Sequence, residues 1–291
     1  MSEQVRTLSR PTDAARMPGY TSLARALVGL LIIGPVLAWS VQALVSGWNF
    51  VDLHVYLGAA ENLVRHGNPY LASDATTDLL HYHYAPWFAL LFVPLLSLPL
   101  VFTEWIWAAA LLAAMVPALM VFRGDGMAAA PLAVLMGALL LGQAMGGNVQ
   151  GVLLALLIWR LDRVDGPVWV GLAASLKAIP ILLVLYYAGR RQWRRAMIAG
   201  VVTAILVGPM PLFDIPPDNL WPGVTGLYAI SPVLWVASAI IAAGCALRLA
   251  GGRYGRLAAA VAIVAALPRL YPFDISWLLL GVPPSRRDDS A

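Results

Sequence analysis

Side chains that could act as acids and bases or bind a metal are concentrated in residues 47–84. This segment holds all four histidines of the chain and four acidic residues: His54, His66, His81, His83, Asp52, Glu61, Asp74 and Asp78. A carboxylate beside a substrate hydroxyl can serve as a general base. His81 and His83 would point the same way in an extended segment, but no cysteine and no close carboxylate pair completes a metal site. These side chains could therefore do acid–base chemistry, and we expect no metal held by the protein.

Residues 52–66 have the pattern of an amphipathic helix with Asp52 in its first turn. Glu61 and Arg65 are four residues apart in the order that favours an ion pair on a helix surface. Gly67 is suited to end the helix in a left-handed conformation, and a proline soon follows. The helix dipole favours a carboxylate at Asp52, which leaves two readings open: a residue that only starts the helix, or a catalytic group.

The composition requires that these residues be held in a membrane. Of 291 residues, 60% are hydrophobic and 12% are charged, whereas a soluble domain has about 25% charged residues. The apolar blocks are long and do not alternate, so helices satisfy the backbone in lipid and a β-barrel is excluded. The fold class is therefore an all-α, polytopic membrane protein. The net charge of +4 fits basic cytoplasmic loops and does not indicate nucleic-acid binding.

The apolar blocks predict about ten transmembrane helices in a single domain, residues 26–291, after a cytoplasmic tail at residues 1–25. A polar and basic stretch precedes the first block, so we expect no cleavable signal peptide. Residues 46–84 form the first outer loop, with the helix of residues 52–66 lying at the membrane interface. We expect both termini in the cytoplasm, and the site to face outward from the plasma membrane.

Further along the chain, the turns are assigned to sides of the membrane by their charge. We expect a tight inner turn at residues 97–99 and outer loops at 123–126 and 160–166. One helix then follows over residues 168–187 and ends in an arginine cluster, residues 190–195, which is the strongest cytoplasmic signal.

Three charged residues outside the first outer loop are candidates for the site. Lys177, the only lysine in the chain, is within an apolar block, where a charge is expensive and usually functional or paired. Arg269 lies nearer the outer face and could bind phosphate or act as an interfacial anchor. Asp274 could add a second polar group to a cavity. Gln143 and Asn148 are expected to form hydrogen bonds between helices.

An ordered set of motifs resembles glycosyltransferase family 87, the polyprenol-phosphate-mannose-dependent mannosyltransferases. The set begins with Asp52-Leu-His-Val-Tyr56 and continues through Gly67-Asn-Pro-Tyr70, Tyr84-Ala-Pro86, Gly142-Gln143 with Asn148, Gly171-Leu-Ala-Ala-Ser-Leu-Lys177-Ala-Ile-Pro180 and Leu267-Pro-Arg-Leu-Tyr-Pro-Phe-Asp274. The resemblance runs in order from Asp52 to Asp274.

The resemblance implies a membrane hexosyltransferase that uses a polyprenyl-phosphate sugar, with mannose as the sugar and a lipid or glycan as the acceptor. It implies that Asp52 is the base of a single, inverting displacement. The expected substrate-binding residues are His54, Tyr56, His83, Tyr84, Lys177, Arg269 and Asp274. We expect no cofactor, although help from a divalent cation stays open.

Two other interpretations remain. The chain could be a transporter or flippase for polyprenyl-linked sugars, or an inactive accessory member of the family. A transporter needs polar groups at mid-membrane from several helices. Here the polar residues are concentrated at the outer interface, which favours an enzyme.

Overall fold

The computed structural model describes residues 38, 42, 45, 47–71, 81–123, 130–216 and 226–283. In these residues the regular structure is entirely helical, which confirms the expected fold class. The elements are α2 (Val51–His66), α3 (Pro86–Leu90), η1 (Val93–Ser97), α4 (Leu100–Leu119), η2 (Met120–Phe122), α5 (Ala130–Gly146), α6 (Gln150–Arg160), α7 (Gly166–Leu176), η4 (Ile179–Leu182), α8 (Leu183–Gly189), α9 (Trp193–Val207), η5 (Met210–Leu212), α11 (Gly226–Ile230), α12 (Pro232–Leu249), α13 (Gly255–Ala266) and η6 (Pro272–Gly281).

Three segments among the described residues are long and apolar enough to cross a membrane: Leu100–Phe122, Trp193–Leu212 and Pro232–Leu249. Large apolar side chains on them face outward, including Trp105 and Ile240. Such faces are stable in lipid, which supports an integral membrane protein. The predicted first span is mostly outside the described residues, so the count of ten remains a prediction.

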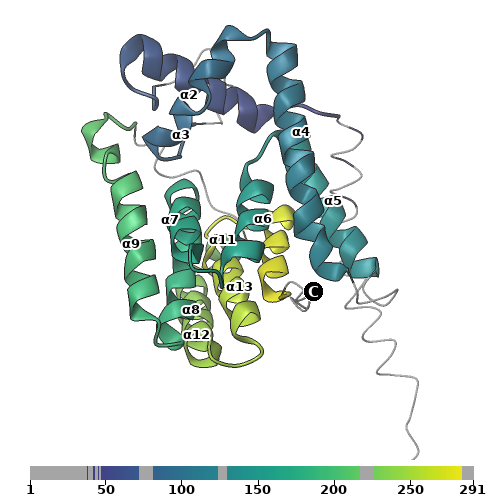
Figure 1. Cartoon of the computed structure of the whole chain (residues 1–291), viewed down its shortest axis with the longest axis vertical. Helices are drawn as coiled ribbons and strands as arrows, with labels where there is room; N and C mark the ends of the chain where they lie inside the picture. The colour runs from purple at the N-terminus through teal and green to yellow at the C-terminus, as the bar shows by residue number, and fades with distance from the viewer. Residues whose placement is uncertain are drawn as a thin grey trace, which may run out of the picture.

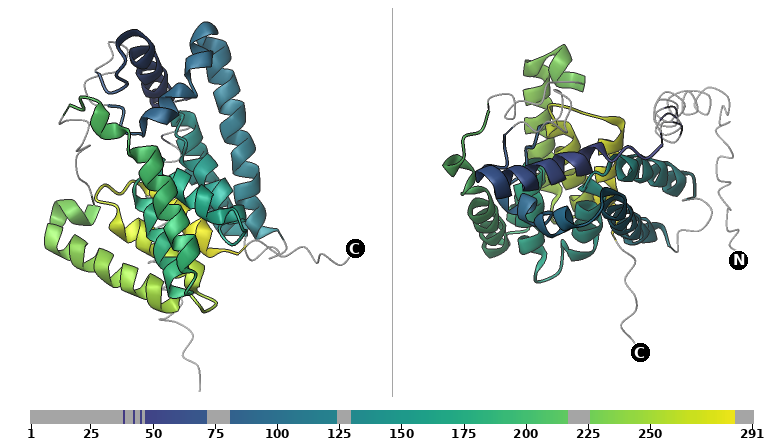
Figure 2. Two further views of the ribbon diagram at one scale, coloured as in Figure 1. Left: turned by 60° about the vertical axis from the view of Figure 1, so that its left-hand side comes forward. Right: turned by 90° about the horizontal axis from the view of Figure 1, so that it is seen from above.

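Helix α2 lies across one end of the helix bundle, as Figure 1 shows at the top and the right-hand view of Figure 2 shows from above. It begins one residue before the predicted start. It ends as expected at Gly67, whose φ of 71° is left-handed and whose N–H bonds to Leu63. The predicted ion pair of Glu61 and Arg65 forms at 2.8 Å. We call the end of the bundle that carries α2 the Asp52 end.

The opposite end is held by an ionic cluster, and we call it the Asp162 end. The Asp162 carboxylate accepts from Arg190 at 3.3 Å and lies 3.6 Å from Arg256. The Arg195 guanidinium donates to the carbonyl of Leu161 at 2.8 Å. These contacts join residues 160–166 to residues 190–195, although opposite sides of the membrane were predicted for them. The two segments lie at the same end, so the prediction of opposite sides, outer for 160–166 and inner for 190–195, is wrong.

The cause is a break at Lys177, since the predicted single helix of residues 168–187 is two helices that form a hairpin. Lys177 has an extended backbone (φ −130°, ψ 107°). Pro180 has no N–H to continue the helical hydrogen bonds, and its ring would clash with the carbonyl four residues earlier. Helix α7 therefore runs from the Asp162 end to Lys177, and α8 returns to Arg190.

The predicted inner turn at residues 97–99 is also wrong. Prolines 86, 94 and 99 divide this stretch into α3 and η1, which are too short to cross a membrane. Glu104, in the first turns of α4, lies 3.0 Å from His54 of α2, so the turn is at the Asp52 end. The far end of α4 meets α6, where Trp159 donates to the carbonyl of Pro117 at 2.8 Å. The loop predicted outside after residue 122 thus starts near the Asp162 end.

Candidate active site

Asp52 is held in place by a turn from a distant part of the chain. It lies in the first turn of α2 but is not the N-cap residue, which is Phe50. Its carboxylate accepts a hydrogen bond of 2.8 Å from the side-chain amide of Asn148. The backbone N–H groups of Asn49 and Phe50 both donate to the carbonyl of Met145 at 3.2 Å. Asp52 is therefore a first-turn residue and not the N-cap, and both readings of it stay open.

Gly147 allows the turn between α5 and α6 to approach α2 this closely. Its φ is 81°, and a Cβ built on it would lie 2.9 Å from the backbone nitrogen of Leu53. The Trp107 indole donates to the Gly147 carbonyl at 2.8 Å. A residue with a side chain would be strained in backbone conformation and would collide with α2. The approach brings Asn148 within reach of Asp52.

A chain of hydrogen bonds leads from Asp52 to Lys177. The Asn148 side-chain oxygen accepts from the backbone N–H of Gln150 at 2.9 Å, which orients the Asn148 NH2 group toward Asp52. The Gln150 side-chain oxygen accepts from the Lys177 ammonium at 2.8 Å. None of the ion pairs found in the described part of the chain includes Lys177. The break between α7 and η4 thus presents Lys177 at the Asp52 end.

The start of η6 supplies the other wall of the site. Asp274 is buried, and its carboxylate accepts from the backbone N–H of Tyr271 at 2.9 Å. The Gln143 amide donates to the carbonyl of Phe273 at 3.0 Å, and Gln150 donates to the Ser276 hydroxyl at 3.3 Å. Helices α5 and α6 are thereby joined to η6 through polar contacts in an apolar interior.

Four charged groups act on one another at this end. Burial raises the pKa of the Asp52 carboxyl, while the charge of Lys177, the hydrogen bond from Asn148 and the charge of Arg269 act in the opposite direction. Lys177 also interacts electrostatically with Asp274. The Arg269 guanidinium stacks over the Tyr271 ring at 4.5 Å. The arrangement combines a partly buried carboxylate with two cations, which suits removal of a proton beside an anionic leaving group.

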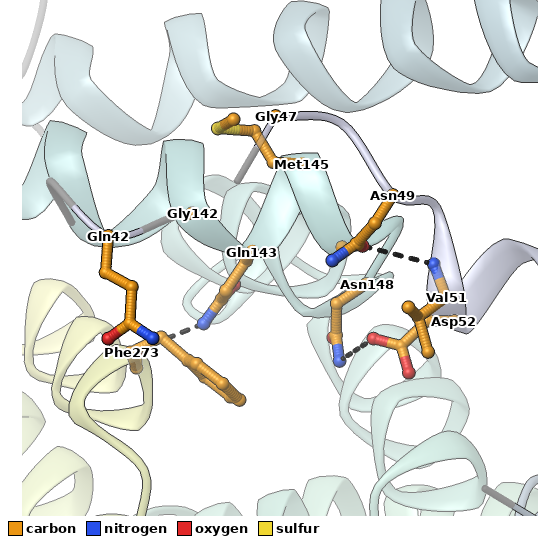
Figure 3. A pocket seen from close by; sticks show the side chains of 11 residues that line it. Gln42, Gly47, Asn49, Val51, Asp52, Gly142, Gln143, Met145, Asn148 and Phe273 are labelled. Atoms are coloured by element: carbon orange, nitrogen blue, oxygen red, sulfur yellow. Dashed lines mark hydrogen bonds between the residues drawn. The ribbon is translucent and has the colours of Figure 1, made fainter. Parts of the chain in front are cut away.

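Asp52 borders a cavity of about 300 Å³. Figure 3 shows this cavity, with Asp52 and Asn148 on one side and Gln143 and Phe273 on the other. Its volume is at the low end of the range of about 300–1,000 Å³ for small-molecule sites. Lys177, Arg269 and Asp274 do not border it.

Two predicted tyrosines lie behind Asp52, in an aromatic cluster. Tyr56 is fully buried and packs against Tyr84, Phe88 and Trp107. Its hydroxyl donates to the Tyr84 hydroxyl at 3.2 Å and accepts from the backbone N–H of Val149 at 3.4 Å. These contacts tie α2 to the start of α6, so both tyrosines are placed to hold Asp52 in position.

The predicted histidines lie away from the cavity. His54 contacts Glu104, and His83 is exposed with its ring 6.4 Å from that of His81. Asp74 and Asp78, named in the sequence analysis, are outside the described residues. Across the described ranges, no group of three histidine, cysteine or acidic residues could hold a metal ion.

Sequence reasoning missed two residues, Gln150 and Ser276, that join Lys177 and Gln143 to the site. A polar side chain within an apolar helix was the available signal. The expected interhelical hydrogen bonds of Gln143 and Asn148 are confirmed. The contact of Asn148 with Asp52 itself was not anticipated.

The family model and the relatives that match this chain point to the same family. Residues 82–221 match the family model described as glycosyltransferase family 87. Two curated relatives, from Mycolicibacterium smegmatis and Mycobacterium tuberculosis, are each 30% identical to this chain over 68% and 69% of its length. Both are described as polyprenol-phosphate-mannose-dependent alpha-(1-2)-phosphatidylinositol pentamannoside mannosyltransferases.

The chain spans about half the length of these relatives, 52% and 51% respectively. No solved structure matches it significantly. The matched residues contain α6, α7 and the Lys177 hairpin, which are central to the site described above. Residues 82–221 therefore belong to glycosyltransferase family 87.

Proposed function

We propose that this chain is a membrane mannosyltransferase that moves mannose from a polyprenyl phosphate to a glycolipid acceptor. The observation that carries the proposal is the environment of Asp52: a carboxylate bordering a cavity, held by Asn148, with Lys177 and Arg269 acting on its charge. The names of the two relatives support mannose as the sugar and a phosphatidylinositol-based glycolipid as the acceptor.

In the proposed reaction, Asp52 takes the proton of an acceptor hydroxyl as the hydroxyl oxygen attacks the anomeric carbon. The bond between that carbon and the phosphate oxygen breaks, and the polyprenyl phosphate leaves with the electron pair. One displacement inverts the anomeric centre, so a β-linked donor gives an α-linked product. The raised pKa of Asp52 suits a base, because a carboxyl closer to neutrality accepts a proton more readily.

Lys177 and Arg269 are proposed to bind the phosphate, whose negative charge grows as the bond breaks. Asp274 would balance the charge of Lys177 while the site is empty, in line with their electrostatic interaction. Tyr56 and Tyr84 are proposed to position α2 behind Asp52. His54 and His83 do not border the cavity, and they are proposed to contact parts of the substrate that extend outside it. No cofactor is invoked.

The proposed location is the plasma membrane, with the Asp162 end in the cytoplasm and the Asp52 end outside. Arginines gather at the Asp162 end, including Arg190, Arg195 and Arg256, as the positive-inside rule requires of a cytoplasmic face. We further propose ten spans with both termini cytoplasmic, and α2 at the outer interface, where a donor phosphate would lie.

The test is sugar transfer in membranes that contain this protein, supplied with labelled polyprenyl-phosphate mannose and a mannosylated phosphatidylinositol acceptor. Asp52→Asn should lower transfer by about 100-fold or more, the range of general-base catalysis. Glu61→Gln, a matched change on the same helix, should retain transfer because Glu61 pairs with Arg65 and does not border the cavity.

Equal transfer by the parent and Asp52→Asn, at equal protein levels, would remove Asp52 from the chemistry. If no transfer occurs but labelled donor crosses the membrane in reconstituted vesicles, the flippase interpretation replaces the enzyme.

A further inference from the structure

Trp107 connects helix α4 to the turn that carries Asn148. Its indole N–H donates to the carbonyl of Gly147 at 2.8 Å. Gly147 directly follows the end of α5, so its carbonyl belongs to a turn between two helices. An indole N–H that is partly buried usually finds an acceptor, and here the acceptor is the backbone next to Asn148. The bond therefore attaches this turn to α4, one of the candidate membrane spans.

The peptide unit between Gly147 and Asn148 is held at both of its polar atoms. Trp107 binds its carbonyl oxygen, and its N–H, which belongs to Asn148, donates to the carbonyl of Gln143 at 3.0 Å. Because a peptide unit is planar, two bonds at opposite edges leave it little freedom to rotate. The direction in which the Asn148 side chain leaves the backbone is thereby restricted, and that side chain reaches Asp52.

The ring of Trp107 also contacts the helix that carries Asp52. Its centroid is 6.1 Å from that of Tyr56, at an interplanar angle of 82°, and 5.1 Å from that of Phe92. Edge-to-face contacts of this kind are favourable. Tyr56 is four residues after Asp52, one turn further along the same side of α2. Trp107 thus touches both elements that meet in the bond between Asn148 and Asp52.

A second indole bond joins α4 and α6 at the other end of the bundle. Trp159 donates to the carbonyl of Pro117 at 2.8 Å, the same length as the Trp107 bond, and both bonds are partly buried. A contribution to packing alone would be shared by the two indoles. The connection to the turn beside Asp52 belongs to Trp107, so Trp159 is its natural control.

We propose that Trp107 is a positioning residue, which holds Asn148 and α2 in the relative placement that the bond between Asn148 and Asp52 requires. The inference rests on the proposed function for the role of Asp52 as the base. Trp107 does not border the cavity, so it acts through Asn148 and does not contact substrate there. Misplacement of a catalytic group by about 1 Å can cost about 100-fold in rate, so a distant bond of this kind matters.

The test compares Trp107→Phe with Trp159→Phe in the full chain, because each variant loses one indole N–H and keeps an aromatic ring. Initial rates of mannose transfer are measured in membranes at equal protein levels. Trp107→Phe should lower kcat about tenfold and change the KM values of donor and acceptor less than about twofold, as expected for a bond that serves the chemical step. Trp159→Phe should retain the kcat of the parent.

The pH profile of kcat/KM gives a readout that packing alone would not move. The hydrogen bond from Asn148 lowers the pKa of Asp52, and the charges of Lys177 and Arg269 act in the same direction. Trp107→Phe weakens the first effect and leaves the two charges in place. Its rising limb should therefore move to higher pH, while that of Trp159→Phe stays where it is in the parent.

A double-mutant cycle tests whether Trp107 acts through Asn148. In a protein that already carries Asn148→Ala, Trp107→Phe should lower kcat by less than about twofold more, whereas independent effects would multiply. Multiplied effects, or equal kinetics and equal pH profiles in Trp107→Phe and Trp159→Phe, would overturn the inference. If Trp107→Phe does not accumulate, 3-benzothienylalanine at position 107 replaces the N–H by sulfur and keeps the ring size. Full activity of that variant would also overturn the inference.

The two proposals can fail separately. A parent that transfers mannose, with Trp107→Phe and Trp159→Phe alike, retains the enzyme and loses the positioning role. A parent that transfers none loses the enzyme, and thermal unfolding in detergent then tests Trp107. Losses in midpoint that are less than additive for Trp107→Phe with Asn148→Ala, but additive for Trp159→Phe with Asn148→Ala, retain the positioning role. Additive losses in both pairs reject it.

Discussion

The side-chain amide of Asn148 donates a hydrogen bond of 2.8 Å to the carboxylate of Asp52, a residue 96 positions earlier in the chain. The same amide is held at its oxygen by the backbone N–H of Gln150, where α6 begins. Asp52 is therefore oriented by a helix start that is itself linked to Lys177 through Gln150. The proposed base and the proposed phosphate-binding cation share one hydrogen-bonded framework.

Removal of the Asn148 amide should lower transfer by about 10- to 100-fold. A hydrogen bond to a charged group contributes about 1.5–3 kcal/mol, and each 1.36 kcal/mol corresponds to a tenfold change in rate. Asn148→Ala should reduce kcat/KM by this amount, measured by initial rates of mannose transfer. Asn62→Ala, a matched change on the same helix, is the control, because Asn62 bonds to the carbonyl of Leu71 and does not border the cavity. Similar losses in both variants would contradict a specific role.

Transfer should increase with pH through the raised pKa of Asp52. Burial favours the neutral acid, so the base is fully ionised only at a pH above the ordinary range of an aspartate. Lys177 and Asn148 both lower this pKa. Lys177→Met and Asn148→Ala should therefore each shift the rising limb of the pH profile of transfer to higher pH. The measurement is the pH profile of kcat/KM for the residual activity. A limb that moves to lower pH in these variants would contradict the assignment of Asp52.

Gly147→Ala should destabilise the protein and reduce transfer, whereas Gly146→Ala should be tolerated. Gly147 has a φ of 81°, and its Cβ would lie 2.9 Å from the backbone of α2. The left-handed backbone alone costs a residue with a side chain about 1–2 kcal/mol. Gly146 ends α5 in open space. Thermal unfolding in detergent measures the difference, and equal midpoints for the two variants would show that α2 is not held at Gly147.

Residues 160–166 and 190–195 should be accessible from the same side of the membrane. Single cysteines at Arg163 and Arg191, both exposed, are introduced after Cys245→Ala removes the native thiol. Both should react with a membrane-impermeant thiol reagent from one side, and His66→Cys should react from the other. Reaction of Arg163→Cys from the His66 side would restore the loop order predicted from charge and refute the hairpin at Lys177.

Much of the local structure could be predicted from residue patterns. The bounds of α2 to within one residue, its end at Gly67 and the ion pair of Glu61 and Arg65 follow from interactions over a few residues, and all three are confirmed. The loop order failed because the spans were predicted from hydropathy and the sides of the loops from their charge. The short segments around Pro94 and Lys177 are as apolar as true spans, and their breaks depend on proline geometry. The segment before residues 97–99 is one crossing fewer than predicted, and the break at Lys177 adds one crossing. The two errors cancel, so α2 and residues 190–195 lie at opposite ends as predicted.

The sequence by itself determined that lipid is the solvent, that helices are the fold and that Asp52 lies in the first turn of an amphipathic helix. Each of these follows from composition or from spacing within one turn. Only the tertiary structure decided which polar residues meet. The start of α6 with Asn148 and Gln150, the break at Lys177 and the start of η6 with Asp274 are far apart in the chain. Their contacts depend on helix direction and packing, which an apolar pattern does not encode. The physical reason is that many helix arrangements bury the same apolar faces, while only one joins these polar groups.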